Sequence, residues 1–397
     1  MTFDEARARA AVLDAADELA PMRDRFDIPD GTLYFDGNSL GPLTRASREV
    51  LTRTIEHEWR VRLIRSWNED WLEMPARVGD AIARLVGASP GTTIACDNTS
   101  INLHKALSAA VRLRPGRGEI VVDADNFPTD IYIAASIAEQ NGLQLVAVPA
   151  DRIVESISER TAVVTATQVD YRSARILDFA GITAAAHAHG ALMVWDLAHS
   201  AGAIEVDLEG HDVDFAVGCG YKYLNGGPGA PAFVYVAPRL LAQADQPLQG
   251  WWGHSEPFGF EIDYRPAPGV ARFLTGTANV LSLKSLEAAL TAFNGVSMAD
   301  VRAKSMSLTS LLVELWETHL APRGFQLASP ADATSRGSHV ALGFPGGEQL
   351  IEALAAQDVV ADFRPPDLMR FGLAPLYNSH SDVVDLVEKI SESDRSH

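Results

Sequence analysis

Lys222 and Asp196 are the two residues of this sequence whose types and surroundings are best suited to chemistry. Lys222 lies between two tyrosines and before the glycine-rich run 225–229, whose glycines let a backbone approach a ligand closely. Asp196 follows the apolar run 191–195. A lysine amine can form an imine with an aldehyde, and a carboxylate can keep an aromatic ring nitrogen protonated. The pair therefore predicts a site for an aromatic aldehyde.

Pyridoxal phosphate (PLP) is the cofactor whose chemistry requires this pair of groups. Taken alone, a lysine is most often a solvated surface charge, and an aspartate after a strand is often a helix cap. Asp196 follows a predicted strand, however, and open α/β sheets bind ligands beyond the carboxyl ends of their strands. His199, three residues after Asp196, is predicted to bind at the rim of the same cofactor.

A PLP phosphate needs donors, and Thr99 and Ser100 stand directly before a predicted helix at 101–113. Hydroxyl groups and free backbone N–H groups at a helix N-terminus bind phosphate, although plain N-capping explains the two residues equally well. Phe127 follows the predicted strand 119–123 and could stack on a flat ring. The alternative is that it only precedes a helix with proline near its start.

The composition excludes several classes of function. The chain has 397 residues, of which 47% are hydrophobic, and a formal net charge of −19, which argues against nucleic acids and anionic membranes as partners. Cys96 and Cys219 are the two cysteines, so we expect no disulfide framework and a cytoplasmic location. We expect no signal peptide, since the first residues form a charged helical pattern. No apolar run of ~20 residues and no metal-ligand or P-loop spacing is found.

The elements that must position these residues alternate between strand and helix from about 76 to 240. We predict strands at 92–96, 119–123, 143–148, 162–167, 191–195 and 215–217, and helices at 3–25, 44–65, 76–87, 101–113, 129–141, 178–189, 280–294 and 300–320. This order predicts an α/β fold with a mostly parallel sheet flanked by helices, plus a smaller α+β domain. The expected divisions are 1–60 (arm and helix, part of the small domain), 61–265 (cofactor domain) and 266–397 (small domain).

Seven runs spread over nearly the whole chain carry a family resemblance. They lie at 35–42, 99–104, 127–130, 195–202, 221–229, 251–254 and 370–379, and include Asp-Gly-Asn-Ser-Leu-Gly, Tyr-Lys-Tyr-Leu-Asn and Pro-Leu-Tyr-Asn-Ser. Through them the chain resembles the kynureninase family, within the class V aminotransferase group of fold-type I PLP enzymes. The resemblance implies the PLP-dependent transferase fold of type I and a homodimer with shared active sites.

The resemblance also assigns roles to single residues. Lys222 would bind PLP covalently and Asp196 would pair with its ring nitrogen. The other cofactor-binding residues would be Thr99, Ser100, Phe127, Asp130, Thr167, His199 and Tyr221 of one subunit, with Trp251 and Thr277 from its partner. Arg370 would bind the substrate carboxylate, a task that suits a planar bidentate donor. Asn38 and Ser39, with tryptophans near Trp59 and Trp67, would lie near the aryl end.

The implied reaction is the hydrolytic cleavage of the Cβ–Cγ bond of L-kynurenine to anthranilate and L-alanine. Lys222 would move the α-proton, and Tyr221 would return a proton to Cβ. The residues leave open whether 3-hydroxykynurenine, which would give 3-hydroxyanthranilate, is preferred. They also leave open whether the role is tryptophan catabolism or NAD biosynthesis.

Three other interpretations are consistent with parts of the pattern. A cysteine desulfurase needs a cysteine on a mobile loop, whereas Cys96 lies at a strand end and Cys219 just before the lysine loop. An aminotransferase would convert 2-oxoglutarate and an amino acid. A non-catalytic PLP-binding protein could lack Lys222 or Asp196, and both are present.

Overall fold

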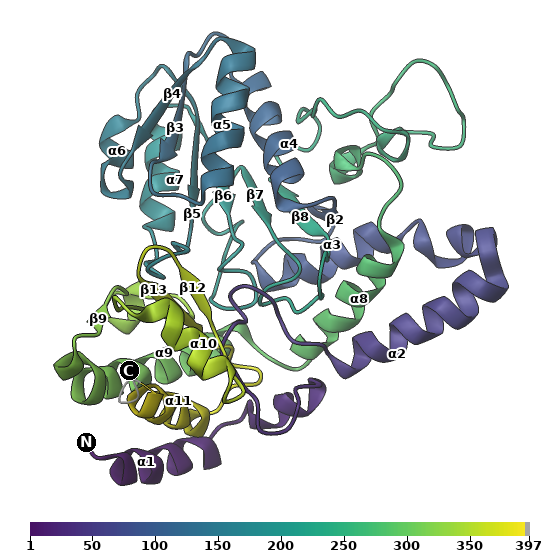
Figure 1. Ribbon diagram of the computed structural model, residues 1–397. Helices are drawn as coiled ribbons and strands as arrows, with labels where there is room; N and C mark the ends of the chain where they lie inside the picture. Colours follow the sequence, from purple (N-terminus) through teal and green to yellow (C-terminus); the bar gives the residue numbers. More distant parts are fainter. Residues whose placement is uncertain (394–397) are drawn as a thin grey trace.

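A seven-stranded sheet positions the residues singled out above. The computed structural model describes residues 1–393, and Figure 1 shows the sheet in the upper half of the molecule. Its strand order is β2-β8-β7-β6-β5-β3-β4. The strands are β2 (Thr93–Cys96), β3 (Glu119–Asp123), β4 (Gln144–Val148), β5 (Thr161–Thr167), β6 (Leu192–Asp196), β7 (Phe215–Gly218) and β8 (Ala232–Val236).

The sheet is mostly parallel, as predicted. β3, β4, β5, β6 and β7 pair in parallel, whereas β8 is antiparallel to both β7 and β2. Strands β2, β5, β6, β7 and β8 are buried along their whole length, which explains their mostly apolar sequences. The sequence prediction did not identify β8.

Helices cover both sides of this sheet (Figure 1). They are α3 (Met74–Leu85), α4 (Thr99–Arg112), α5 (Pro128–Asn141), α6 (Ile153–Ser156) and α7 (Phe179–Ala188), while α8 (Val280–Leu290) lies below the sheet in this view. Helices α4 and α5 pack side by side, α6 packs on α7, and α3 packs on α8. Because helix and strand alternate along the chain, the carboxyl ends of the parallel strands meet at one edge of the sheet.

A second, smaller sheet follows in the C-terminal part of the chain. Its order is β12-β13-β10-β9, all antiparallel, with β9 (Gln326–Leu327), β10 (His339–Gly343), β12 (Asp362–Arg364) and β13 (Leu368–Gly372). Helices α9 (Met298–Leu315), α10 (Gly347–Ala355) and α11 (His380–Ser393) accompany it, and the N-terminal helix α1 (Phe3–Ala15) packs on α11 (Figure 1). A two-residue strand β1 (Leu33–Tyr34) pairs in parallel with β11 (Val359–Val360).

Two apolar clusters form the interior of the molecule. One lies around the large sheet and includes residues of α8, and the other joins α1, α9, α11 and the small sheet. The domain divisions at 60 and 265 stay predictions, because the packing of side chains does not by itself divide a chain. Within residues 1–393, no helix is long and apolar enough to cross a membrane.

The helix predicted for 44–65 is broken near its end. It starts as α2 (Arg45–Arg53) and continues as a π-helix over Thr54–Arg62. Leu63, with a φ of 55°, ends the helix, and a short 3₁₀ turn over Leu63–Arg65 follows. The helix predicted for 3–25 ends at Ala15, and a 3₁₀ turn at Ala20–Arg25 follows it. The side chain of Thr44 caps α2 by accepting a hydrogen bond from the backbone N–H of Ser47 at 3.0 Å.

Candidate active site

The side chain of Lys222 is presented by a tightly held loop after β7. The backbone N–H of Asn225, a residue with a φ of 59°, donates to the carbonyl of Lys222 at 2.9 Å and closes the turn. The N–H of Gly41 donates to the carbonyl of Tyr221 at 2.7 Å. A Cβ on Gly41 would lie 2.4 Å from the carbonyl oxygen of Lys222, so this approach requires glycine. The lysine loop therefore rests against the loop at 36–42.

The amine of Lys222 points to a buried histidine. Its Nζ lies 2.9 Å from Nε2 of His199 and 5.9 Å from the ring centre of Tyr221. Nδ1 of His199 has no hydrogen-bond partner among the described residues. Burial, reinforced by the charge of Lys222, holds the pKa of His199 well below its usual range. The neutral ring can therefore accept a hydrogen bond from the lysine.

Asp196 ends β6 and faces the same space as Lys222. It is in register with Thr167 of the neighbouring strand β5, and its Oδ1 accepts a hydrogen bond from the N–H of Ala198 at 2.8 Å. Burial raises its pKa, and the charge of Lys222 opposes that rise. Burial together with the charge of Asp196 raises the pKa of Asp130 well above its usual value, so Asp130 is the carboxyl that keeps a proton.

One cavity brings together nine of the residues that the sequence assigned to the cofactor. It is lined by Thr99, Ser100, Phe127, Asp130, Thr167, Asp196, His199, Tyr221 and Lys222, together with Asn126, Thr129, Tyr171 and Ala198. They come from the loops after β2, β3, β5, β6 and β7, at the carboxyl edge of the sheet. Their roles stay predictions, but their meeting in one cavity is what those roles require.

The parts of this cavity fit the parts of PLP. Asp196 is a buried carboxylate that forms no ion pair with the residues of 1–393, which suits a protonated ring nitrogen. The ring of Phe127 is 47% exposed and meets Tyr171 edge to face at 5.2 Å, so one ring surface is free for stacking. Asn98 caps α4 by accepting from the N–H of Ile101 at 3.0 Å. Capping therefore does not account for the hydroxyls of Thr99 and Ser100.

Trp251 and Thr277 lie outside the cavity in the single chain. The ring of Trp251 stacks on Trp252 at 5.4 Å and meets Trp67 at 6.1 Å. Thr277 is exposed on the segment before α8. Neither residue lines the cavity around Lys222.

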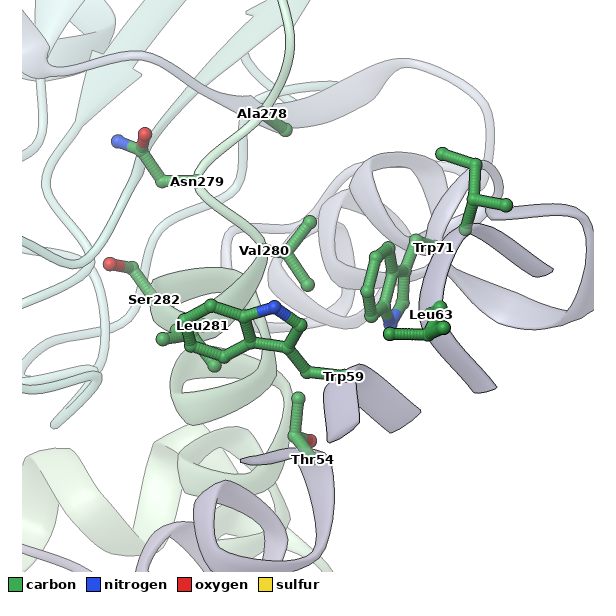
Figure 2. Close-up of a pocket in the computed structure, with 10 residues that line it drawn as sticks. Thr54, Trp59, Leu63, Trp71, Ala278, Asn279, Val280, Leu281 and Ser282 are labelled. Carbon is green, nitrogen blue, oxygen red and sulfur yellow. The ribbon is translucent and has the colours of Figure 1, made fainter. Parts of the chain in front are cut away.

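A larger pocket of about 590 Å³ next to Thr277 is shown in Figure 2. It is lined by Thr54, Trp59, Leu63, Ile64, Trp71, Ala278, Asn279, Val280, Leu281 and Ser282. None of these side chains ionises, and Trp59, which the resemblance placed near the aryl end, lies across this pocket from Val280 (Figure 2). The pocket offers mainly apolar surface, and its lining has no acid or base that could activate the hydroxyls of Thr54 and Ser282. We therefore place the reaction at the cavity around Lys222.

Arg370 is buried in β13, and most of its hydrogen-bonding capacity is already used. Nε donates to Oδ1 of Asp362 at 2.8 Å, and Nη2 donates to Oδ2 of Asp362 and to Oγ of Ser39, the latter at 3.0 Å. Nη1 donates to the backbone carbonyl of Tyr171 at 2.6 Å. Four of the five N–H groups are occupied, so one N–H on Nη1 is left for a substrate.

Two acidic residues beside Arg370 were missed by the sequence analysis. Asp362 forms the ion pair, and the hydrogen bonds of Arg370 hold the pKa of Asp362 below its usual value against the effect of burial. Burial and the charge of Asp362 raise the pKa of Asp36 to about 7. Ser39, placed by the resemblance near the aryl end, contacts Arg370 and Asp362 in the structure. The signals in the sequence were the Asp-Gly-Asn-Ser-Leu-Gly run for Asp36 and the Asp-x-Arg run that begins at Asp362.

Comparison with known proteins decides the family. Residues 301–390 match the model of the kynureninase C-terminal domain. A kynureninase of Deinococcus radiodurans is 47% identical over 95% of this chain and 93% of its own, and one of Pseudomonas fluorescens is 45% identical over 96% and 93%. The chain belongs to the kynureninase family. A kynureninase of Burkholderia pseudomallei, at 43% identity over 97% and 95%, agrees with this.

Solved structures that resemble this kynureninase-family chain share its fold at low identity. A C-DES mutant with glycine covalently linked to the PLP cofactor has a TM-score of 0.82 at 19% identity, covering 93% of this chain and 99% of its own. The Escherichia coli cysteine desulfurase CsdA has a TM-score of 0.80 at 21% identity, covering 96% and 99%. These similarities establish the fold-type I architecture of PLP enzymes that the sequence predicted.

The two cysteines of the kynureninase-family chain do not suit desulfurase chemistry. Cys96 and Cys219 are both unpaired and buried. Burial raises the pKa of Cys96 to about 11 and also raises that of Cys219. Because the nucleophile in sulfur transfer is an accessible thiolate, neither cysteine can serve.

Proposed function

We propose that this protein is a kynureninase that hydrolyses the Cβ–Cγ bond of L-kynurenine to give anthranilate and L-alanine. The observation that carries the proposal is the meeting of Lys222, Asp196 and Tyr221 in one cavity. Membership of the kynureninase family supplies the substrate class. One water is consumed: its hydroxyl completes the carboxyl group of anthranilate, and a proton completes the methyl group of alanine.

PLP, when bound, supplies an electron sink that stabilises negative charge at Cα, which carries the amine, and at the adjoining Cβ. Lys222 would hold the cofactor covalently, and Asp196 would hold its ring nitrogen. Phe127 and His199 would contact the ring, and Thr99 and Ser100 would bind the phosphate at the N-terminus of α4. Asp130 and Thr167 would complete the wall of the site, as members of the same cavity.

Lys222 is the residue we propose for proton transfer at Cα. A general base must lie within hydrogen-bond reach of the proton it takes, and Lys222 is the one amine that lines the cavity. Its contact of 2.9 Å with Nε2 of His199 keeps Nζ in place between transfers. His199 itself stays neutral, because burial depresses its pKa, and it therefore serves as a holder rather than as a competing acid.

Tyr221 is the residue we propose for protonation of Cβ. Burial and nearby negative groups raise the pKa of its phenol well above the usual value, so the hydroxyl stays protonated at neutral pH. A retained proton is what a general acid needs before the C–C bond breaks. This role would distinguish Cβ–Cγ cleavage from transamination, in which no proton is delivered to Cβ.

We further propose that two copies of the chain complete each site. Trp251 and Thr277, which the family resemblance assigns to a partner subunit, lie outside the cavity of their own chain. Around Thr277 the surface exposes Trp59, Leu63 and Ile64, and apolar side chains in such a group are typical of a protein interface. The segment between β8 and α8, which carries Trp251, forms a loop away from the sheet (Figure 1). A homodimer would bury both surfaces, and light scattering of the holoenzyme should give twice the chain mass.

A steady-state assay with L-kynurenine and 3-hydroxy-L-kynurenine tests the activity. The fluorescence of anthranilate or 3-hydroxyanthranilate reports turnover, and the same assay gives the preference between the two substrates. Lys222→Ala should abolish the activity, while Lys389→Ala, a change on α11 away from the cavity, should not. Absence of turnover with both substrates in a PLP-loaded protein would refute the proposal. Formation of glutamate from 2-oxoglutarate would indicate an aminotransferase instead.

A further inference from the structure

The substrate carboxylate needs more donors than Arg370 has free. A carboxylate offers two oxygen atoms, and the bidentate face of this guanidinium, Nε and Nη2, is bound to Asp362. One N–H of Nη1 remains. If Asp362 keeps its place, a second donor must serve the other carboxylate oxygen.

His339 on β10 is placed to be that donor. In the antiparallel pairing of β10 with β13, His339 lies opposite Gly372, and Ala341 lies opposite Arg370. Opposed residues and residues two apart share one face of a sheet, so His339 and Arg370 are diagonal neighbours on the same face. The space over Gly372 holds the amide of Asn38, whose Oδ1 would lie 2.1 Å from an added Cβ.

The imidazole of His339 is buried and lacks hydrogen bonds. Its exposed fraction is 0%, and neither ring nitrogen makes a hydrogen bond within residues 1–393. The backbone of Arg172 lies near the ring but forms no hydrogen bond with either ring nitrogen. A buried polar group without a partner destabilises the folded chain. Such a group is retained where a ligand supplies the partner.

The ring of His339 also lies next to His199. Its centre is 5.4 Å from that of His199, edge to face, and His199 contacts Nζ of Lys222. Burial lowers the pKa of His339 to about 3, and the charge of Arg370 acts in the same direction. A neutral imidazole has one N–H donor. His339 therefore adjoins the histidine that contacts Lys222 and, across the strand pair, lies diagonal to Arg370.

We propose that His339 binds the substrate by donating a hydrogen bond to its α-carboxylate, beside the single free N–H of Arg370. The inference rests on the proposed function and adds a second carboxylate-binding residue to it. It is independent of the aryl part of the substrate, so it can be tested with the product L-alanine alone. L-Alaninamide, which has no carboxylate, provides the matched ligand.

The test compares the holoenzyme with His339→Phe, which keeps the ring shape without nitrogen, and His339→Gln, which restores a neutral donor. Calorimetry measures the Kd of L-alanine and of L-alaninamide for each protein. We expect His339→Phe to raise the Kd of L-alanine about tenfold or more and the Kd of L-alaninamide less than twofold. We expect His339→Gln to remain within about threefold of the wild type for both ligands. The KM for kynurenine should rise in His339→Phe more than kcat falls.

Three results would overturn the inference. The first is an unchanged Kd of L-alanine in His339→Phe at an unchanged melting temperature. The second is equal weakening of both ligands, which indicates a packing role. The third is a wild-type protein that does not prefer L-alanine to L-alaninamide, since no carboxylate is then recognised. Kynurenine turnover is a separate readout, so failure of the proposed function is distinguished from failure of this inference.

Discussion

Nζ of Lys222 lies 2.9 Å from Nε2 of His199, although the two residues follow different strands of the sheet. β6 and β7 are parallel neighbours, so the loops that leave their carboxyl ends emerge side by side. The contact is therefore a product of the sheet topology. It links the proposed base to a ring that burial keeps neutral.

Loss of this contact should slow catalysis without removing the cofactor. In His199→Phe the amine of Lys222 loses its acceptor, and we expect kcat to fall about 10–100-fold, the range for a hydrogen bond to a charged group. Cofactor content, read from PLP absorbance after desalting, should stay near one per chain. The exposed His211→Phe serves as the control. A full kcat in His199→Phe would contradict the holding role.

Removal of the charge of Asp196 should affect both chemistry and stability. Asp196→Asn cannot keep a ring nitrogen protonated, and we expect kcat to fall about 100-fold or more. In the cofactor-free protein, the raised pKa of Asp196 means that its ionisation opposes folding. Apo Asp196→Asn should therefore melt at a higher temperature than the wild type at pH 8. An apo variant less stable than the wild type at that pH would contradict the claim that burial disfavours the ionised Asp196. The exposed Asp151→Asn serves as the control.

Asp36 should make stability fall as the pH rises toward neutrality. Its pKa is about 7 in the folded chain, against 3.8 as the ordinary value, so the folded state binds more protons between these pH values. The protonated Asp36 contributes its full stabilisation below pH 3.8, and this contribution is lost as the pH rises through about 7. Between pH 5 and 7.5 we expect the wild type to lose on the order of 2 kcal/mol relative to Asp36→Asn. Urea unfolding at several pH values measures the difference, and parallel curves would contradict the assignment.

The pair of Arg370 and Asp362 should contribute strongly to stability, because a buried charge is left uncompensated when its partner is removed. The side chain of Arg370 is 1% exposed and that of Asp362 is 14% exposed. We expect Asp362→Asn to lower the free energy of unfolding by about 3 kcal/mol. Glu56→Gln, which breaks an exposed pair with Arg60 within one helix, should change it by less than about 0.5 kcal/mol. Equal effects in the two variants would contradict this difference.

The large sheet and its site could be predicted because each signal is local. The strand at 119–123 is found at those residues, since an apolar run followed by a turn marks a buried parallel strand. Lys222 and Asp196 follow such strands, and parallel strands bring their carboxyl ends to one edge. Nine proposed cofactor residues meet there for that reason.

The small sheet and its charged cluster could not be predicted in the same way. β9 and β12 have two and three residues, too few for a periodic pattern. Asp362 reaches Arg370, and His339 lies diagonal to it, only through the register of β10, β12 and β13. That register depends on packing against distant parts of the chain. The sequence pattern of the family located Arg370 but not the residues that accept its hydrogen bonds.

The covalent attachment of PLP to Lys222 is the claim on which the account depends most. Reduction of the holoenzyme with borohydride fixes the cofactor to the amine that binds it, and peptide mass mapping then locates the label. We predict one pyridoxyl group per chain, on the peptide that contains Lys222. A label on another lysine, or an unlabelled protein that still retains PLP after reduction, would contradict the account.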